Sequence, residues 1–289
     1  MVASPIDEPS TPPPMASSET IQERWAEFAE AIERLAERIG DPNDFEVRPD
    51  SSLAGDDRAS HPFEVSQTLR HLINATVDQL HGVKTAVHDA EQMHIAVSAT
   101  LARAALENAA AGLWILGPQQ RNERILRALR WHSRNYADQA GHARASGLYT
   151  EQFRAAHDEK MQRIAVIAEG RGIDAAVAQK GYATTAPIKG GGEFTELPVF
   201  TDWQIASGFA HGRPWAHFGF TDRVRSGGSA EHPIYTVSAR EDFTLYLPIQ
   251  ALHLLAELLR LRDRRAGLPM TSLPDGSPDS EPAAYSRRR

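Results

Sequence analysis

The feature that most constrains the fold is an apolar stretch from Ile95 to Leu116. It is apolar on nearly every side, which predicts a helix buried inside a bundle of other helices. Three larger polar side chains interrupt it along one stripe, since residues three and four apart share a helix face: Thr100, Arg103 and Glu107. Gly117 and Pro118 end this helix, and an arginine-rich helix is expected from Gln119 to about Tyr136. We therefore predict an all-α protein, a helical bundle with long loops and disordered termini.

Composition limits the classes of function. The 289 residues are 41% hydrophobic, enough to bury a core, and the net charge of -7 argues against a general nucleic-acid-coating role. There is no cysteine, which removes disulfides, thiolate metal sites and cysteine nucleophiles. No signal peptide and no membrane span are visible, so we expect a cytoplasmic protein with no membrane partner. A homodimer through the first or last helix is possible, and the scarcity of lysine indicates a GC-rich genome.

The apolar periodicity predicts one helical domain over residues 20–266, between disordered segments 1–19 and 267–289. Besides the central pair, helices are expected over 20–39, from about Pro62 through Val87, over 150–169 and over 247–265. The polar segment 41–60 is expected to be a linker loop, 141–147 a break, and 181–200 a long loop containing three glycines. Residues 234–237 and 243–246 are expected to pair as a small hairpin.

Arg103 and Glu107 lie one turn apart in the helix predicted to be most buried. An ion pair there is costly to desolvate, so it needs further partners or a functional reason. One interpretation is a buried clasp that fixes the register of the helix. The other is a pair that lines a functional cleft.

The segment from Thr201 to Gly212 holds a second group of polar residues. Thr201 with Gln204 fits a capping box, and Gly212 fits a helix end. Trp203, Ser207 and His211 follow at four-residue spacing, so they share one face and the hydroxyl could reach the ring. Serine beside histidine is part of a nucleophile system, but there is no Gly-x-Ser-x-Gly elbow and no evident orienting acid. A histidine satisfied in the core is the alternative interpretation.

The arginine-rich helix is expected to present a solvated outer face, because its arginines follow steps of three and wind around the axis: Arg121, Arg124, Arg127, Arg130 and Arg134. His132 lies on the opposite, inward face. The pairs His81 with His88 and Asp138 with His142 do not complete a coordination set, so no metal is expected. There is also no Walker loop or dinucleotide fingerprint, and no cofactor is expected.

The pattern of Arg103 and Glu107 in a buried helix, followed far downstream by Ser207 and His211, resembles uncharacterised bacterial all-helical families. Those families have an Arg-x-x-x-Glu helix and a later Ser-x-x-x-His segment. The resemblance implies a helical bundle and carries no established activity.

A more distant resemblance is to HEPN-type helical domains of toxins and phage-defence ribonucleases, whose signature places an arginine four to six residues from a histidine. Arg127 and His132 match that spacing. This resemblance implies metal-free RNA cleavage, in which a histidine moves the proton of the ribose 2'-hydroxyl and an arginine stabilises charge on the phosphate. Arg103 with His211 is then the favoured pair, with Arg213 assisting.

The leading hypothesis is a non-catalytic helical binding or interaction module whose polar centre is mainly structural. The alternative is a HEPN-like, metal-independent ribonuclease or toxin, and RNA is a partner only under that alternative. A nuclease needs arginine and histidine exposed together, whereas a module can bury them. A third class, a sensor of a small ligand, would use Trp203, Trp215 and Phe218 around a pocket. We therefore expect Arg103, Glu107, Ser207 and His211 to converge, with Trp203, Arg213 and Trp215 as binding residues.

Overall fold

The computed structural model describes residues 17–41 and 44–269, and most of these are helical, as predicted. In chain order the elements are α1 (Ser18–Gly40), α2 (Ser52–Ser60), α3 (Val65–Val83), the π-helix η1 (Lys84–Asp89), α4 (Val97–Leu116), α5 (Arg121–Ala145), α6 (Glu151–Glu169), α7 (Ala175–Gln179), α8 (Ala186–Gly192), α9 (Val199–Ala210), α10 (Pro214–Phe220), β1 (Asp222–Gly228), β2 (Pro233–Ser238) and α11 (Glu241–Ala266).

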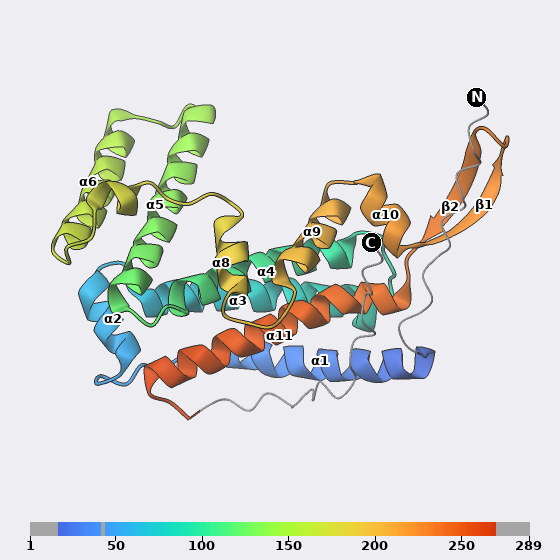
Figure 1. Cartoon of the computed structure of the whole chain (residues 1–289), viewed down its shortest axis with the longest axis horizontal. Coiled ribbons are helices and arrows are strands. Elements are labelled where there is room, and N and C mark those ends of the chain that lie inside the picture. The colour runs from blue at the N-terminus through green and yellow to red at the C-terminus, as the bar shows by residue number, and fades with distance from the viewer. Residues whose placement is uncertain (1–16, 42–43, 270–289) are drawn as a thin grey trace, which may run out of the picture.

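Helix α4 lies at the centre of the molecule, because it contacts α3 and α11 and is also covered by α8 and α9 (Figure 1). Its buried residues include six alanines, one glycine, Gly112, and the apolar run from Leu113 to Leu116. Small side chains allow neighbouring helices to approach closely, which explains how one helix packs against so many others. The prediction of a buried central helix is confirmed from Ser98 onward, whereas Val97 at its start and Met93 and Ile95 in the preceding loop are exposed.

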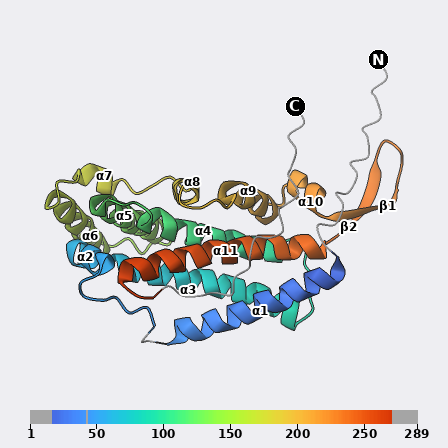
Figure 2. The ribbon, with the colours of Figure 1, turned by 60° about the horizontal axis from the view of Figure 1, so that its bottom comes forward.

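Helices α1, α3, α4 and α11 lie side by side as the main bundle (Figure 2). The predicted seam of α1 is buried against it through Trp25, Phe28, Ile32 and Leu35. The side chain of Ser17 caps α1, which therefore begins inside the segment 1–19 that was predicted to be disordered. Residues 1–16 of that segment, and residues 270–289 of the predicted tail, lie outside the described residues.

The linker predicted over 41–60 is wrong in its second half, which forms α2. The Ser51 side chain caps this helix by accepting a hydrogen bond from the backbone of Ala54. Asp56 is fully buried on α2 and pairs with Arg124 of α5, whose side chain is only 2% exposed. The expectation of a solvated arginine face is therefore wrong for Arg124, because helical spacing alone does not reveal a buried carboxylate from another segment.

Helix α5 continues through Gly141 and ends at Ala145, inside the break predicted over 141–147. A β-carbon added at Gly141 would meet nothing within 4 Å, so this glycine lies in open space and only weakens the helix. Helices α5 and α6 form a helical hairpin at one end of the molecule (Figure 1). The capping of α6 by Thr150 is confirmed.

The long loop predicted over 181–200 contains α8, which includes all three glycines of Gly190–Gly192. A β-carbon at Gly191 would lie 2.3 Å from the carbonyl oxygen of Ala110. A β-carbon at Gly190 would lie 2.7 Å from the side chain of Trp114, whereas one at Gly192 would meet no atom of α4. Gly190 and Gly191 are therefore required by the close approach of α8 to α4, and packing overrides their poor helix propensity.

The hairpin forms between β1 and β2, and the predicted pairing of 234–237 with 243–246 is wrong. Residues 243–246 lie in α11, which begins at Glu241 and has Pro248 inside it rather than in its first turn. The hairpin projects from the end opposite α5 and α6 (Figure 1), with Val224 68% and Ile234 61% exposed.

The predicted capping box at Thr201 is also wrong, because α9 begins earlier, at Val199, with Pro198 in the cap position.

Candidate functional site

The structure brings four of the predicted site residues together where α9 crosses α4. Arg103 Nε donates to Glu107 Oε1 at 3.0 Å, and Trp203 Nε1 donates to the same oxygen at 2.7 Å. Arg103 Nη1 lies 3.4 Å from Nε2 of His211, which caps the end of α9. Because a guanidinium can only donate, Nε2 of His211 must accept in this arrangement. We call Arg103, Glu107, Trp203 and His211 the clasp.

The clasp lies at the surface and not in the core. The side chains of Arg103 and Glu107 are 24% and 35% exposed, and His211 is exposed. The expectation of a buried clasp is corrected, because the face of α4 that carries Arg103 and Glu107 is only partly covered. Such a half-exposed pair contributes little to stability by itself, about 0 to 1 kcal/mol.

The remaining predicted site residues are not part of this contact. Within the described chain, the Ser207 hydroxyl makes no hydrogen bond to the His211 ring, so their four-residue spacing produces no Ser–His pair. Arg213 is exposed at the start of α10. Trp215 and Phe218 are exposed on α10, while Trp203 stacks on Phe200, so the three predicted aromatic residues do not enclose one pocket.

The two residues with HEPN-like spacing contact different parts of the molecule. Arg127 donates to the carbonyl oxygen of Trp114 and to the carboxylate of Glu123. His132 faces α3 and contacts Thr68. Their separation along the helix therefore does not produce a shared site.

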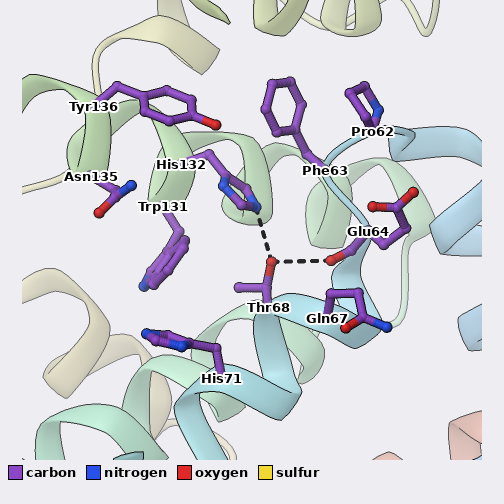
Figure 3. A pocket seen from close by; sticks show the side chains of 10 residues that line it. All are labelled: Pro62, Phe63, Glu64, Gln67, Thr68, His71, Trp131, His132, Asn135 and Tyr136. Atoms are coloured by element: carbon purple, nitrogen blue, oxygen red, sulfur yellow. Dashed lines mark hydrogen bonds between the residues drawn. The ribbon is translucent and has the colours of Figure 1, made fainter.

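A surface hollow lies between α3 and α5 (Figure 3). It has a volume of about 390 Å³, and we call it the aromatic pocket. Its walls come from the start of α3 and the middle of α5: Pro62, Phe63, Glu64, Gln67, Thr68, His71, Trp131, His132, Asn135 and Tyr136. None of these is a lysine or an arginine, and Glu64 provides the one carboxylate.

The ring of His132 packs against three other aromatic rings in this pocket (Figure 3). The centre of its ring lies 5.0 Å from that of Phe63, 5.1 Å from that of Trp131 and 6.3 Å from that of Tyr136. Burial lowers the pKa of His132 to about 4, because the apolar rings disfavour a charged imidazole. The side chain is therefore neutral at physiological pH.

The hydrogen bonds of Thr68 determine which nitrogen of His132 carries the proton. The Thr68 hydroxyl donates to the backbone carbonyl of Glu64 at 3.1 Å, which uses its one hydrogen. Nε2 of His132, 3.0 Å from the same hydroxyl oxygen, must then be the donor of the second bond. Nδ1 is left with a lone pair, and it has no hydrogen-bond partner among the described residues.

Glu64 supplies negative charge to the aromatic pocket. Burial alone would raise its pKa, but the hydrogen bond with His61 and that with its own backbone outweigh burial and lower it. The carboxylate is thus ionised at neutral pH. It also interacts electrostatically with the ring of His132.

A second hollow of about 140 Å³ adjoins the first, since Trp131 lines both. It lies between α4 and the segment that leads into α8, and Glu107 of the clasp is part of its wall. Arg103 and His211 line neither hollow. The aromatic pocket and the clasp are therefore separate sites. The second hollow lies between them, since Trp131 and Glu107 both line it.

Within residues 17–41 and 44–269, no group of three or more histidine, aspartate or glutamate side chains could hold a metal ion. The helices in that part of the chain are all too short or too polar to cross a membrane. Comparisons of the chain with known protein families, with curated proteins and with solved structures find no match.

Sequence reasoning missed the aromatic pocket although two signals were present. His132 and Tyr136 are four residues apart and share a helix face, and His132 was predicted to lie inside. Phe63 and Glu64 follow a proline immediately before α3, a place where the chain enters a helix. The sequence could not show that these two segments, more than 60 residues apart, face each other.

Proposed function

We propose that this protein is a non-catalytic helical binding module whose ligand site is the aromatic pocket. The observation that supports this is the combination on one wall of several aromatic rings, one carboxylate and an imidazole nitrogen with a free lone pair. Its volume of about 390 Å³ falls within the usual range for small-molecule sites. The clasp serves this module structurally, by fastening α9 to α4.

A fragment screen by ligand-observed NMR on the full chain tests this proposal. Asn135→Trp would fill the aromatic pocket from the exposed side of α5 without changing the core. Asp138→Trp places the same bulk nearby on α5 at an exposed position outside the pocket, so it is the matched control. We expect fragments that bind the natural chain and Asp138→Trp, but not Asn135→Trp. Equal binding to Asn135→Trp, or no binding to the natural chain, would contradict the proposal.

A second candidate function is a metal-independent ribonuclease of HEPN type that uses the clasp. The approach of Arg103 to His211 favours it, because such a reaction needs an arginine beside a histidine at an accessible surface. The test is cleavage of single-stranded RNA in the presence of a chelator. Under this candidate, His211→Ala abolishes cleavage, while His232→Ala in the exposed hairpin loop does not. RNA that stays intact, or cleavage that survives His211→Ala, rejects the candidate.

A further inference from the structure

The aromatic pocket contains one carboxylate and no lysine or arginine side chain. Glu64 is ionised, and His132 is neutral. A buried anionic ligand would therefore meet a carboxylate and no compensating cation. A ligand of positive charge would complement the pocket.

The rings favour the same charge. The face of an aromatic ring is electron-rich, so rings around a cavity attract a cation that replaces part of its hydration shell with them. Tyr136 already shows this behaviour, since the ammonium nitrogen of Lys160 lies 4.9 Å from the centre of its ring. Phe63 and Trp131 are the other carbocyclic rings of the wall, and each packs against the imidazole of His132.

His132 adds a directional requirement. Its Nε2 donates to Thr68, which leaves Nδ1 as a hydrogen-bond acceptor on the wall. A ligand that presents an N–H donor can satisfy this nitrogen, whereas a fully methylated ammonium ion cannot. The pocket thus provides an acceptor, a carboxylate and apolar ring surface.

We infer that the aromatic pocket binds an organic ammonium ion that retains at least one N–H and carries an apolar body. This inference rests on the proposed function and names the ligand class for the same site. The N–H donates to Nδ1 of His132, the charge lies within the field of Glu64, and the apolar body packs on Trp131 and Phe63. Two groups compete with such a ligand: the ammonium group of Lys160 lies over the ring of Tyr136, and the ring of His61 hydrogen-bonds Glu64.

Isothermal titration calorimetry on the full chain at pH 7 tests the inference with three probes of similar shape. 2-Phenylethylammonium has the charge and the donor, 2-phenylethanol has a donor without charge, and benzyltrimethylammonium has the charge without a donor. We expect 2-phenylethylammonium to bind at least about tenfold more tightly than either of the others.

Two substitutions test whether the ammonium ion binds in the aromatic pocket, one by removing a negative charge and the other by removing a positive charge. Glu64→Gln keeps the size of the side chain and should weaken binding of 2-phenylethylammonium at least about threefold, without changing that of 2-phenylethanol. Lys160→Gln removes a competing cation from the rim and should strengthen ammonium binding. Circular dichroism of both variants verifies that the helices are intact.

The outcomes separate this inference from the proposed function. If 2-phenylethanol binds as tightly as the ammonium ion, the ligand class is wrong and the pocket remains a binding site. If benzyltrimethylammonium binds equally well, the hydrogen bond to His132 is refuted. If none of the three probes binds, the ligand class is also wrong, and the fragment screen with Asn135→Trp decides independently whether the pocket binds anything.

Discussion

The carboxylate of Asp56 receives two hydrogen bonds from the guanidinium of Arg124, from Nε at 2.6 Å and from Nη2 at 2.8 Å. Arg124 also donates to the carbonyl oxygens of Pro118 and Gln119. Both charged groups are buried, and removal of Arg124 leaves Asp56 with only its bond from the 46% exposed Arg121, whose Nε donates to Oδ1 at 3.0 Å. At the scale of single residues, this pair is a main determinant of how α2 attaches to α5.

Arg124→Met should therefore lower the free energy of unfolding by about 3 to 5 kcal/mol. Adding Asp56→Asn to that variant should recover part of the loss, since it removes a buried carboxylate that would then be paired with Arg121 alone. Arg134→Met is the control, because its pair with Asp138 is exposed and should cost less than about 1 kcal/mol. Urea denaturation measures all three, and equal costs for Arg124→Met and Arg134→Met would contradict the argument.

Asp202 is a buried carboxylate with an incomplete hydrogen-bond set. Tyr246 donates to its Oδ1 at 3.0 Å, while the buried Oδ2 has no partner among the described residues. Burial raises the pKa of Asp202 from 3.8 to about 6, and the hydrogen bond from Tyr246 only partly opposes this. The folded state therefore holds the proton more tightly than the unfolded state, and stability falls as pH rises from about 4 to about 6.

Asp202→Asn should remove this pH dependence. Two pKa units correspond to about 3 kcal/mol, so the variant should gain stability relative to the natural chain by about 1 to 3 kcal/mol between pH 4 and pH 7. The lowered pKa of His132 acts in the opposite direction over a similar range, but both proteins share it and it cancels in the difference. Thermal unfolding at several pH values measures the difference, and parallel pH profiles would refute the assignment.

At the scale of elements, α8 shows how packing can stabilise a helix that its own sequence disfavours. Three consecutive glycines predict a loop, yet they allow the backbone of α8 to lie directly on α4. Gly191 is the point of closest approach, whereas a β-carbon at Gly192 would meet only Val199, at an ordinary 3.7 Å.

Gly191→Ala should therefore destabilise the protein by about 2 to 4 kcal/mol, because the new methyl group would overlap the backbone of Ala110. Gly192→Ala should be neutral or stabilising by less than about 1 kcal/mol, since alanine is the better helix former. The midpoints of thermal unfolding compare the two variants. Similar values for both would show that α8 is not held in contact with α4.

Features that depend on local sequence could be predicted, whereas features that depend on distant segments could not. Helices α1, α3, α4 and α6 were predictable because each carries an apolar face of regular spacing. Helix α8 and the start of α11 were not, since one depends on a neighbouring backbone and the other continues through Pro248. The approach of Arg103 to His211 was predictable because each is a polar residue on an otherwise apolar helix. The functional role of the two residues stays a prediction. The aromatic pocket was not predictable, because it depends on how α3 packs against α5, and the sequence of neither helix shows this.

At the scale of the whole molecule, stability is expected to be graded from α4 outward. Ala109 and Ile115 of α4 are fully buried, so their amides should exchange with solvent only when the whole molecule unfolds. The strands β1 and β2 pair with each other and expose both faces, and an isolated hairpin is marginally stable. Amides of the hairpin such as that of Thr236 should therefore exchange at least about a thousandfold faster. Hydrogen exchange followed by NMR tests this, and uniform protection would refute it.

The alanine-rich surface of α4 also bears on how freely this sequence can vary. Because α3, α8, α9 and α11 all pack on one helix, a larger residue at the buried positions Ala102, Ala105 or Ala109 would overlap the neighbouring helices. A library of random substitutions selected for folding should thus tolerate change on α6 and in the hairpin while keeping α4 nearly constant. Variation accumulated over generations would be confined to the two ends of the molecule, leaving its middle as a fixed frame.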